Sequence, residues 1–233
     1  MKEKAVILLS GGLDSSTCLA IAKAEGFDPL AVTFDYGQRH RVELEAARRV
    51  AAAASTPLMT VRFDMRLWGG SALTSDQIDV PDADPFHSGV PVTYVPARNL
   101  IFLSFGVSYA ETVGARDLYI GVNSLDYSGY PDCRPDFISS FSRTAQLGTK
   151  AVDEGWTFRI HAPLQNLRKT EIIKRGLELG VDYSLTHSCY NPDPDGAPCE
   201  KCDSCFLRTQ AFGELGLTDP LLLKKRKLRG EKA

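Results

Sequence analysis

The sequence lacks long hydrophobic runs, a charge of one dominant sign, internal repeats and low-complexity linkers. Its longest apolar stretches fall far short of the roughly 18 residues that a membrane span requires. The basic start, Met1–Lys4, precedes only five apolar residues, too few for a signal peptide, so we expect a cytoplasmic protein. A net charge of −2 gives no whole-protein electrostatic footprint for nucleic acid, and neither nucleic acid nor membrane is an expected partner.

The 233 residues, 43% of them apolar, suffice for one large core or for one core with a small appendage. A single basic run, residues 224–229, lies at the C-terminus, where we expect a solvated tail that frays.

Strand-like and helix-like segments alternate along the chain. This pattern predicts an α/β fold, a doubly wound and mostly parallel sheet whose ligands lie at the carboxyl ends of the strands. We divide the chain into an α/β domain, 1–184, and a small C-terminal element, 185–233, which is rich in loops. Within the α/β domain, Leu67–Pro96 has no clear periodicity and is expected to be a long functional loop. The expected strands are Lys4–Leu9, Pro29–Phe34, Leu58–Phe63, Asp117–Val122 and Phe158–Ala162, and the expected helices are Ser15–Glu25, Val42–Ala54, Arg98–Val113, Pro135–Glu154 and Lys169–Leu179.

Four of the six cysteines lie within seventeen residues, in the pattern C-x₉-C-x₂-C-x₂-C: Cys189, Cys199, Cys202 and Cys205. Reduced thiols clustered in this way indicate a metal site, and four thiolates suit tetrahedral Zn²⁺ in a structural role. An iron–sulfur cluster is the alternative, but no further cysteine or proline follows closely as in ferredoxin-type runs.

The turn after the first expected strand, Ser10–Ser16, combines two glycines with three serines and an acid. Backbone N–H groups at such a strand-to-helix turn favour a phosphate chain, and serine hydroxyls add donors. The Lys of the kinase-type P-loop and the third glycine of a dinucleotide fingerprint are missing. A carboxylate at Asp14 is repulsive there unless a cation such as Mg²⁺ bridges it to phosphate. The alternative is an ordinary turn in which Ser or Asp caps the helix.

The motif S-G-G-x-D-S resembles the fingerprint of the PP-loop ATP pyrophosphatases, whose fold is that of the adenine nucleotide alpha hydrolases. The resemblance implies that the loop grips the β,γ-pyrophosphate of ATP while an oxygen nucleophile attacks the α-phosphorus and AMP later leaves. It further implies that Asp14, Ser15, Arg134 and Lys169 take part in catalysis, although Lys169 could equally be an exposed lysine at a helix start. The implied ATP-binding residues are Leu8, Leu9, Ser10, Gly11, Gly12, Leu13, Asp14, Ser15, Ser16, Thr17, Cys18, Thr33, Phe34 and Arg98, of which Cys18 also reads as a small core residue.

A second polar loop, 121–137, follows the fourth expected strand. Together with "FDYGQRH" (34–40), "VPARN" (95–99) and the cysteine cluster, it resembles the 7-cyano-7-deazaguanine synthases of the queuosine pathway. The resemblance implies that 7-carboxy-7-deazaguanine, ammonia and ATP become a nitrile through an adenylated acid and an adenylated amide. It also implies a homodimer. We recognise no glutamine-hydrolysing segment, so free ammonia is the expected nitrogen donor.

Within this loop we expect a carboxylate, Asp126 or Asp132, to accept the two N–H donors of a guanine-like edge. Tyr127 or Tyr130 would stack on the bicycle, and Arg134 would pair with the substrate carboxylate or the α-phosphate.

Four alternatives stay open from the sequence. A tRNA thiolase or another ATP-dependent amidating ligase would use the same nucleotide loop, and a zinc-knuckle RNA-binding adaptor would explain the cysteines and the basic run. Cys133 could form a covalent thioester or thioimidate during the reaction.

Overall fold

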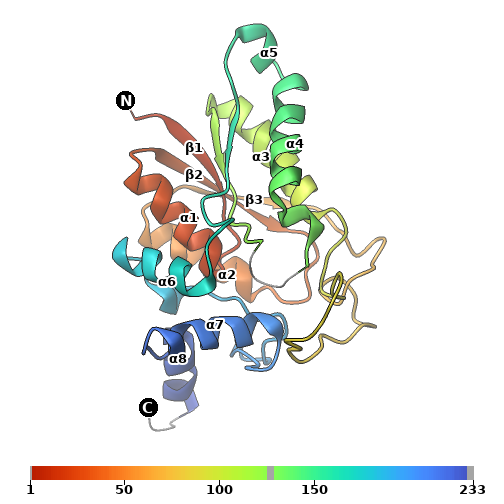
Figure 1. Ribbon diagram of the computed structural model, residues 1–233, viewed down its shortest axis with the longest axis vertical. Coiled ribbons are helices and arrows are strands. Elements are labelled where there is room, and N and C mark those ends of the chain that lie inside the picture. Colours follow the sequence, from red (N-terminus) through yellow and green to blue (C-terminus); the bar gives the residue numbers. More distant parts are fainter. Residues whose placement is uncertain (1, 125–128, 230–233) are drawn as a thin grey trace.

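The computed structural model describes residues 2–124 and 129–229, so Asp126 and Tyr127 lie outside the described residues. A five-stranded parallel sheet forms its centre, in the order β3-β2-β1-β4-β5 (Figure 1). This arrangement confirms the predicted α/β fold. The strands are β1 (Lys4–Leu8), β2 (Asp28–Asp35), β3 (Leu58–Arg62), β4 (Asp117–Tyr119) and β5 (Arg159–His161).

Helices cover both faces of the sheet, as parallel strands require. The helices are α1 (Leu13–Ala24), α2 (Val42–Ala53), α3 (Arg98–Val113), α4 (Pro135–Leu147), α5 (Ala151–Glu154), α6 (Lys169–Glu178), α7 (Asp203–Glu214) and α8 (Pro220–Arg229), with short 3₁₀ turns η1 (Pro131–Cys133) and η2 (Tyr183–Leu185). One core joins alternate side chains of the strands to α3 and α4. The other joins the opposite side chains to α1, α2, α6 and α7 (Figure 1).

Two predicted elements differ from those in the structure by more than two residues at one end. The fourth strand ends at Tyr119 rather than Val122, because the chain then leaves the sheet and lines a cavity. The single helix expected over Pro135–Glu154 is two helices, since α4 ends at the C-cap Gly148 and α5 starts at Ala151.

The C-terminal element holds two helices, α7 and α8, that the loop-rich prediction missed. The prediction of a fraying basic tail is also wrong, because residues 220–229 form α8. Lys225 Nζ donates to the Pro198 carbonyl at 2.8 Å and pairs with Glu200, which ties α8 to the cysteine segment.

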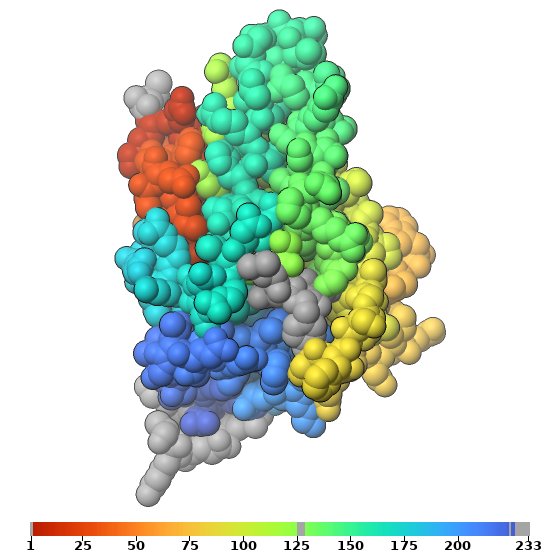
Figure 2. Space-filling view, in the orientation of Figure 1, coloured from red at the N-terminus to blue at the C-terminus, as the bar shows by residue number. Residues whose placement is uncertain are grey.

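The expected long loop is confirmed, since no helix or strand occurs between β3 and α3. It packs against the C-terminal element (Figure 2): Ala83 N donates to the Lys201 carbonyl at 2.8 Å, and Asp84 N donates to the Asp203 carboxylate at 3.3 Å. Within the described ranges, no helix has the length and apolar character to cross a membrane.

Candidate active site

A cavity of about 250 Å³ opens at the carboxyl ends of β1, β2 and β4. The chain crosses from β1 to β2 on one side and reaches β4 on the other, so the cavity lies at the topological switch point of the sheet, where α/β folds bind ligands. Its wall is formed by the ends of these strands, the start of α3, the segment after β4 and residues of the C-terminal element. Predicted site residues in the wall are Leu8, Leu9, Ser10, Gly12, Leu13, Asp14, Ser15, Thr33, Phe34, Arg98, Tyr130 and Lys169.

The turn between β1 and α1 presents hydroxyls to this cavity. Ser10 Oγ lies 3.0 Å from Ser15 Oγ and accepts a hydrogen bond from Gly12 N at 3.2 Å. Gly12 is the N-cap of α1, and no side-chain hydrogen bond caps the helix there. The alternative of a turn capped by its own Ser or Asp is therefore wrong. The turn directs the positive end of the helix dipole at the cavity.

Gly11 is required for a reason beyond the close approach of an anion. Its φ is +84°, and a Cβ there would lie 2.4 Å from Ala47 N and 2.6 Å from the Glu43 carbonyl oxygen. The turn is thus packed directly against the backbone of α2. Gly121 packs as closely on the other side, since its Cβ would lie 2.9 Å from Ser15 N.

Three predicted nucleotide contacts on α1 do not line the cavity. Ser16 Oγ donates to the Gly12 carbonyl at 2.7 Å, and Thr17 Oγ1 lies 2.8 Å from the Tyr183 hydroxyl. Cys18 is fully buried in the core, and burial raises the pKa of its thiol well above the usual range. The core role expected for Cys18 is confirmed.

Lys169 reaches from the start of α6 to Asp14 at the cavity wall. Its ammonium lies 3.0 and 2.8 Å from the two carboxylate oxygens, and its side chain is only 15% exposed. The alternative of an exposed lysine at a helix start is therefore wrong. Lys169 supplies positive charge beside the acid that made the turn unusual.

The apolar part of the wall comes from β2 and α3. Phe34 stacks on Phe102 with ring centroids 4.0 Å apart, and both line the cavity beside the buried Thr33. Flat apolar side chains next to strand-end backbone suit a planar base.

The start of α3 is capped from a distance. Its N-cap, Ala97, has a left-handed conformation with φ 56° and no side-chain acceptor. The Asp132 carboxylate takes that place, accepting from Asn99 N at 3.0 Å. Asp132 is buried behind the wall and does not line the cavity, whereas Arg98 and Asn99 do.

The other described residues of loop 121–137 divide between wall and surface. Tyr130 lines the cavity, and its hydroxyl lies 2.9 Å from Thr93 Oγ1. Cys133 also lines it, accepts from Asn99 Nδ2 at 3.4 Å, and has its pKa raised to about 12 by burial. Arg134 is exposed at the N-cap of α4, away from the lining residues, so its catalytic role stays a prediction.

The C-terminal element supplies a wall that sequence reasoning missed. His187 N donates to the Gly11 carbonyl at 2.9 Å, and Ser188 Oγ accepts from Leu13 N at 3.4 Å. Burial lowers the pKa of His187 to about 4, with help from nearby Arg208, so its ring is neutral. These residues come just before Cys189, and that proximity to the first cysteine of the cluster was the available signal.

Buried Arg208 holds this segment in place. Its guanidinium donates to both carboxylate oxygens of Asp219, at 2.7 and 2.9 Å. It also donates to Thr186 Oγ1 at 2.7 Å and to the Tyr183 carbonyl at 3.0 Å. A satisfied buried pair of this kind fixes geometry more than it adds stability.

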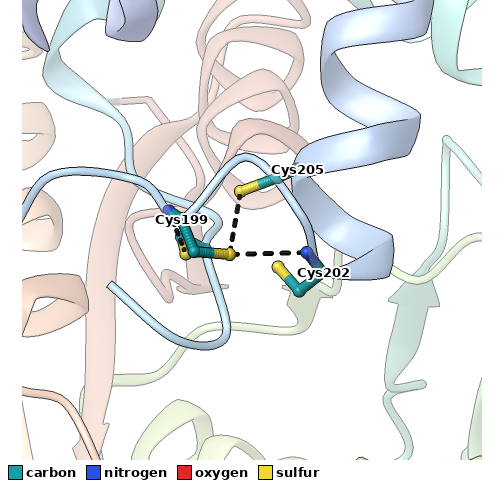
Figure 3. A group of neighbouring side chains, drawn as sticks. Cys199, Cys202 and Cys205 are labelled. Atoms are coloured by element: carbon teal, nitrogen blue, oxygen red, sulfur yellow. Dashed lines mark hydrogen bonds between the residues drawn. The ribbon is translucent and has the colours of Figure 1, made fainter. Parts of the chain in front are cut away.

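The four clustered cysteines converge at the start of α7, and Figure 3 shows Cys199, Cys202 and Cys205 among them. All four Sγ atoms lie within 4.8 Å of one another, and those of Cys199 and Cys205 are 4.0 Å apart. Zn–S bonds of about 2.3 Å in a tetrahedron place sulfurs about 3.8 Å apart. The cluster is thus suited to hold zinc.

Hydrogen bonds converge on the sulfurs of the cluster. Backbone N–H groups of Asn191 and Cys199 donate to Cys189 Sγ at 3.3 and 3.2 Å. Hydrogen bonds from Cys189 and Cys205 lower the pKa of Cys202, while the same contacts raise the pKa of Cys205, so the thiols share protons among themselves. The cavity wall at His187–Ser188 lies directly before this cluster, so a metal there would anchor part of the site.

Comparisons with known proteins agree on one family. The sequence model of the family described as "Queuosine biosynthesis protein QueC" matches residues 4–216. A "7-cyano-7-deazaguanine synthase" from Syntrophotalea carbinolica is 60% identical over 222 residues, which cover 94% of this chain and 96% of that protein. Proteins of the same name from Myxococcus xanthus and Geobacter sulfurreducens are 58% and 60% identical, over 94% and 95% of this chain and 97% and 93% of theirs.

Proposed function

The chain belongs to the family of the queuosine biosynthesis protein QueC, and we propose that it makes 7-cyano-7-deazaguanine from 7-carboxy-7-deazaguanine, ammonia and ATP. The observation that carries the proposal is the Ser10–Ser15 turn at the switch-point cavity, with the Lys169–Asp14 pair beside it. An anion-binding turn and a cation at one place suit a triphosphate.

The chemistry follows from the weakness of a heteroaromatic carboxylate as an electrophile. The acid oxygen attacks the α-phosphorus of ATP and releases pyrophosphate, and ammonia then displaces AMP to give the primary amide. The amide oxygen attacks a second α-phosphorus, and loss of AMP and of the N–H protons gives the nitrile. One site serves both activations because each brings an oxygen of the substrate to the α-phosphorus of an ATP bound in the same place.

Some wall residues are suited to bind the phosphates of ATP, and others are suited to bind its adenine base. Ser10, Ser15 and the N–H groups at the start of α1 hold the pyrophosphate, while Lys169 neutralises its charge. Thr33 and Phe34 hold the adenine. The Asp14 carboxylate is the residue suited to a Mg²⁺ ion, which would offset phosphate charge when bound.

The substrate end of the cavity is the part near Arg98 and Tyr130. Tyr130 offers a ring for stacking, and Arg98 offers a guanidinium for the substrate carboxylate. Asp132 positions the start of α3, and with it Arg98, by accepting from Asn99 N. Asp126, Tyr127 and Arg134 remain proposed contacts of the substrate loop.

The C-terminal element, 185–233, is proposed to hold structural zinc at Cys189, Cys199, Cys202 and Cys205. Homodimerisation is proposed from the resemblance to the family alone.

The test is to incubate the purified protein with ATP, Mg²⁺, ammonium and the carboxylic acid, without RNA, and to follow products by mass spectrometry. Formation of AMP, pyrophosphate and the nitrile is expected. A requirement for tRNA, or sulfur incorporation in place of nitrogen, would favour a thiolase instead. A matched control is Ser108→Ala on the exposed side of α3, beside Ser10→Ala in the turn, with only the latter expected to lose activity.

A further inference from the structure

Glu43 lies in the cavity wall, in the first turn of α2. No sequence motif singles it out. Its position is fixed, because its carbonyl oxygen packs against Gly11, where even a Cβ would come within 2.6 Å. The residue therefore lies beside the turn proposed to hold the pyrophosphate, within the same cavity as Ser15 and Arg98.

No hydrogen bond or ion pair joins the Glu43 carboxylate to another side chain in the part of the chain that the structure describes. Burial raises the pKa of this carboxyl to about 7, and the positive charge of Arg98 only partly offsets it. Tyr36 faces Glu43 from the segment after β2. The other titratable groups of this environment are those around Arg98, namely Tyr130, Tyr190 and Asp132, and those that share the cavity, namely Asp14, Lys169 and His187.

The proposed reaction needs a proton acceptor. Ammonia attacks only as the neutral molecule, whereas at neutral pH nearly all of it in solution is ammonium. A carboxylate in a partly desolvated wall attracts the cation, and desolvation in turn lowers the pKa of the ammonium that it binds. General bases work best with a pKa near the working pH.

We propose that the Glu43 carboxylate binds ammonium in the cavity and takes one of its protons, so that neutral ammonia attacks the acyl adenylate. This inference rests on the proposed function. The carboxylate becomes a carboxylic acid as ammonium becomes ammonia. The ammonia nitrogen then forms the C–N bond, AMP leaves with the electrons of the C–O bond, and the nitrogen gives up a second proton to water. Glu43 later returns its own proton to solvent.

Glu43→Gln is the variant that tests this. Its kcat/KM for total ammonium at pH 7 is expected to fall by about 100-fold or more. Its rate should rise about tenfold per pH unit between pH 6 and 8, following free ammonia, while the wild type levels off above about pH 7. Glu45→Gln is the matched control, since Glu45 lies exposed on the same helix turn, and it should behave as wild type.

Two further measurements separate a lost base from a damaged site. Pyrophosphate exchange into ATP, driven by the carboxylic acid without ammonium, should persist in Glu43→Gln within about twofold. Hydroxylamine, which is uncharged at neutral pH and needs no base to deliver it, should trap the adenylate as the hydroxamate at the wild-type rate.

Unchanged ammonium kinetics in Glu43→Gln would overturn the proposal. Loss of pyrophosphate exchange, or a raised KM for ATP or for the acid, would also overturn it and make Glu43 a ligand of those substrates. Absence of exchange and of hydroxamate in the wild type would instead overturn the proposed function. A variant that does not fold is replaced by Glu43→Asp, for which a partial loss restricted to ammonium is expected.

Discussion

The ammonium of Lys169 contacts both carboxylate oxygens of Asp14, at 3.0 and 2.8 Å, across 155 residues of sequence. The pair joins the start of α6 to the first turn of α1, at the wall of the cavity. An acid within an anion-binding turn is thereby compensated by the chain itself. A bound triphosphate would compete with Asp14 for Lys169, while Asp14 would become available to a metal ion.

Replacing Lys169 with alanine should reduce the rate of AMP formation by about 100-fold to 1000-fold. This is the usual effect of removing one hydrogen-bond donor from the charge that develops in a transition state. The variant leaves Asp14 without this cation next to the phosphates. Steady-state kinetics with ATP as the varied substrate measures the effect. Lys174→Ala, on the exposed face of α6, is the control. Activity within a few-fold of wild type in Lys169→Ala would remove Lys169 from the catalytic machinery.

The cysteine cluster should bring one zinc ion per chain through purification, measured by elemental analysis. Cys202→Ser should lose the metal and about 3 kcal/mol or more of folding stability, which corresponds to a drop in Tm of about 6–12 °C at this chain length. Cys133→Ser, outside the cluster, should keep its zinc. Iron in place of zinc, with visible absorbance, would favour the iron–sulfur alternative.

Cys133 should not act as a nucleophile, although it lines the cavity. With the pKa raised to about 12 by burial, only about one thiol in 100,000 is ionised at pH 7. Turnover by Cys133→Ala is therefore expected to stay within a few-fold of wild type. Intact-protein mass spectrometry of samples quenched during turnover should show no adduct. A trapped thioester at Cys133 would reverse this conclusion.

The half-buried carboxyl of Glu43 should also make stability depend on pH. Its folded-state pKa of about 7 lies above the usual value of 4.5, so the folded state binds the extra proton between these pH values. Stability due to this group is present below about pH 4.5 and is lost as pH rises to about 7, by at most about 3 kcal/mol. Glu43→Gln should lack this loss. Denaturant unfolding at pH 5 and pH 8 measures it, and equal pH dependence in both proteins would contradict a raised pKa.

Much of the fold could be predicted from the sequence because its signals are local. Apolar runs and helical periodicity located all five strands and most helices to within a few residues. The density of donors at Ser10–Ser16 located the turn that faces the cavity, and cysteine spacing located the cluster of thiols. The split of α4 from α5 was missed because a single glycine is a weak signal that a helical pattern ends. The helicity of residues 220–229 was missed because a run of charges is a weak signal for a helix.

The rest of the site depends on contacts between distant segments, which single-sequence patterns do not specify. Lys169 could not be paired with Asp14, and Asp132 could not be seen to cap α3. Glu43 looked like an ordinary acid in a helix first turn, a position that the helix dipole favours anyway. The positions of His187 and Arg208 near the cavity result from the tertiary packing that brings the cysteine segment against Gly11.

The most direct test of the account is to follow oxygen from 7-carboxy-7-deazaguanine labelled with ¹⁸O at both carboxylate oxygens. If each oxygen in turn captures the α-phosphorus, two AMP molecules form per nitrile and each carries one ¹⁸O, detected by mass spectrometry. Label found in inorganic phosphate or in water, with AMP unlabelled, would contradict activation at the α-phosphorus.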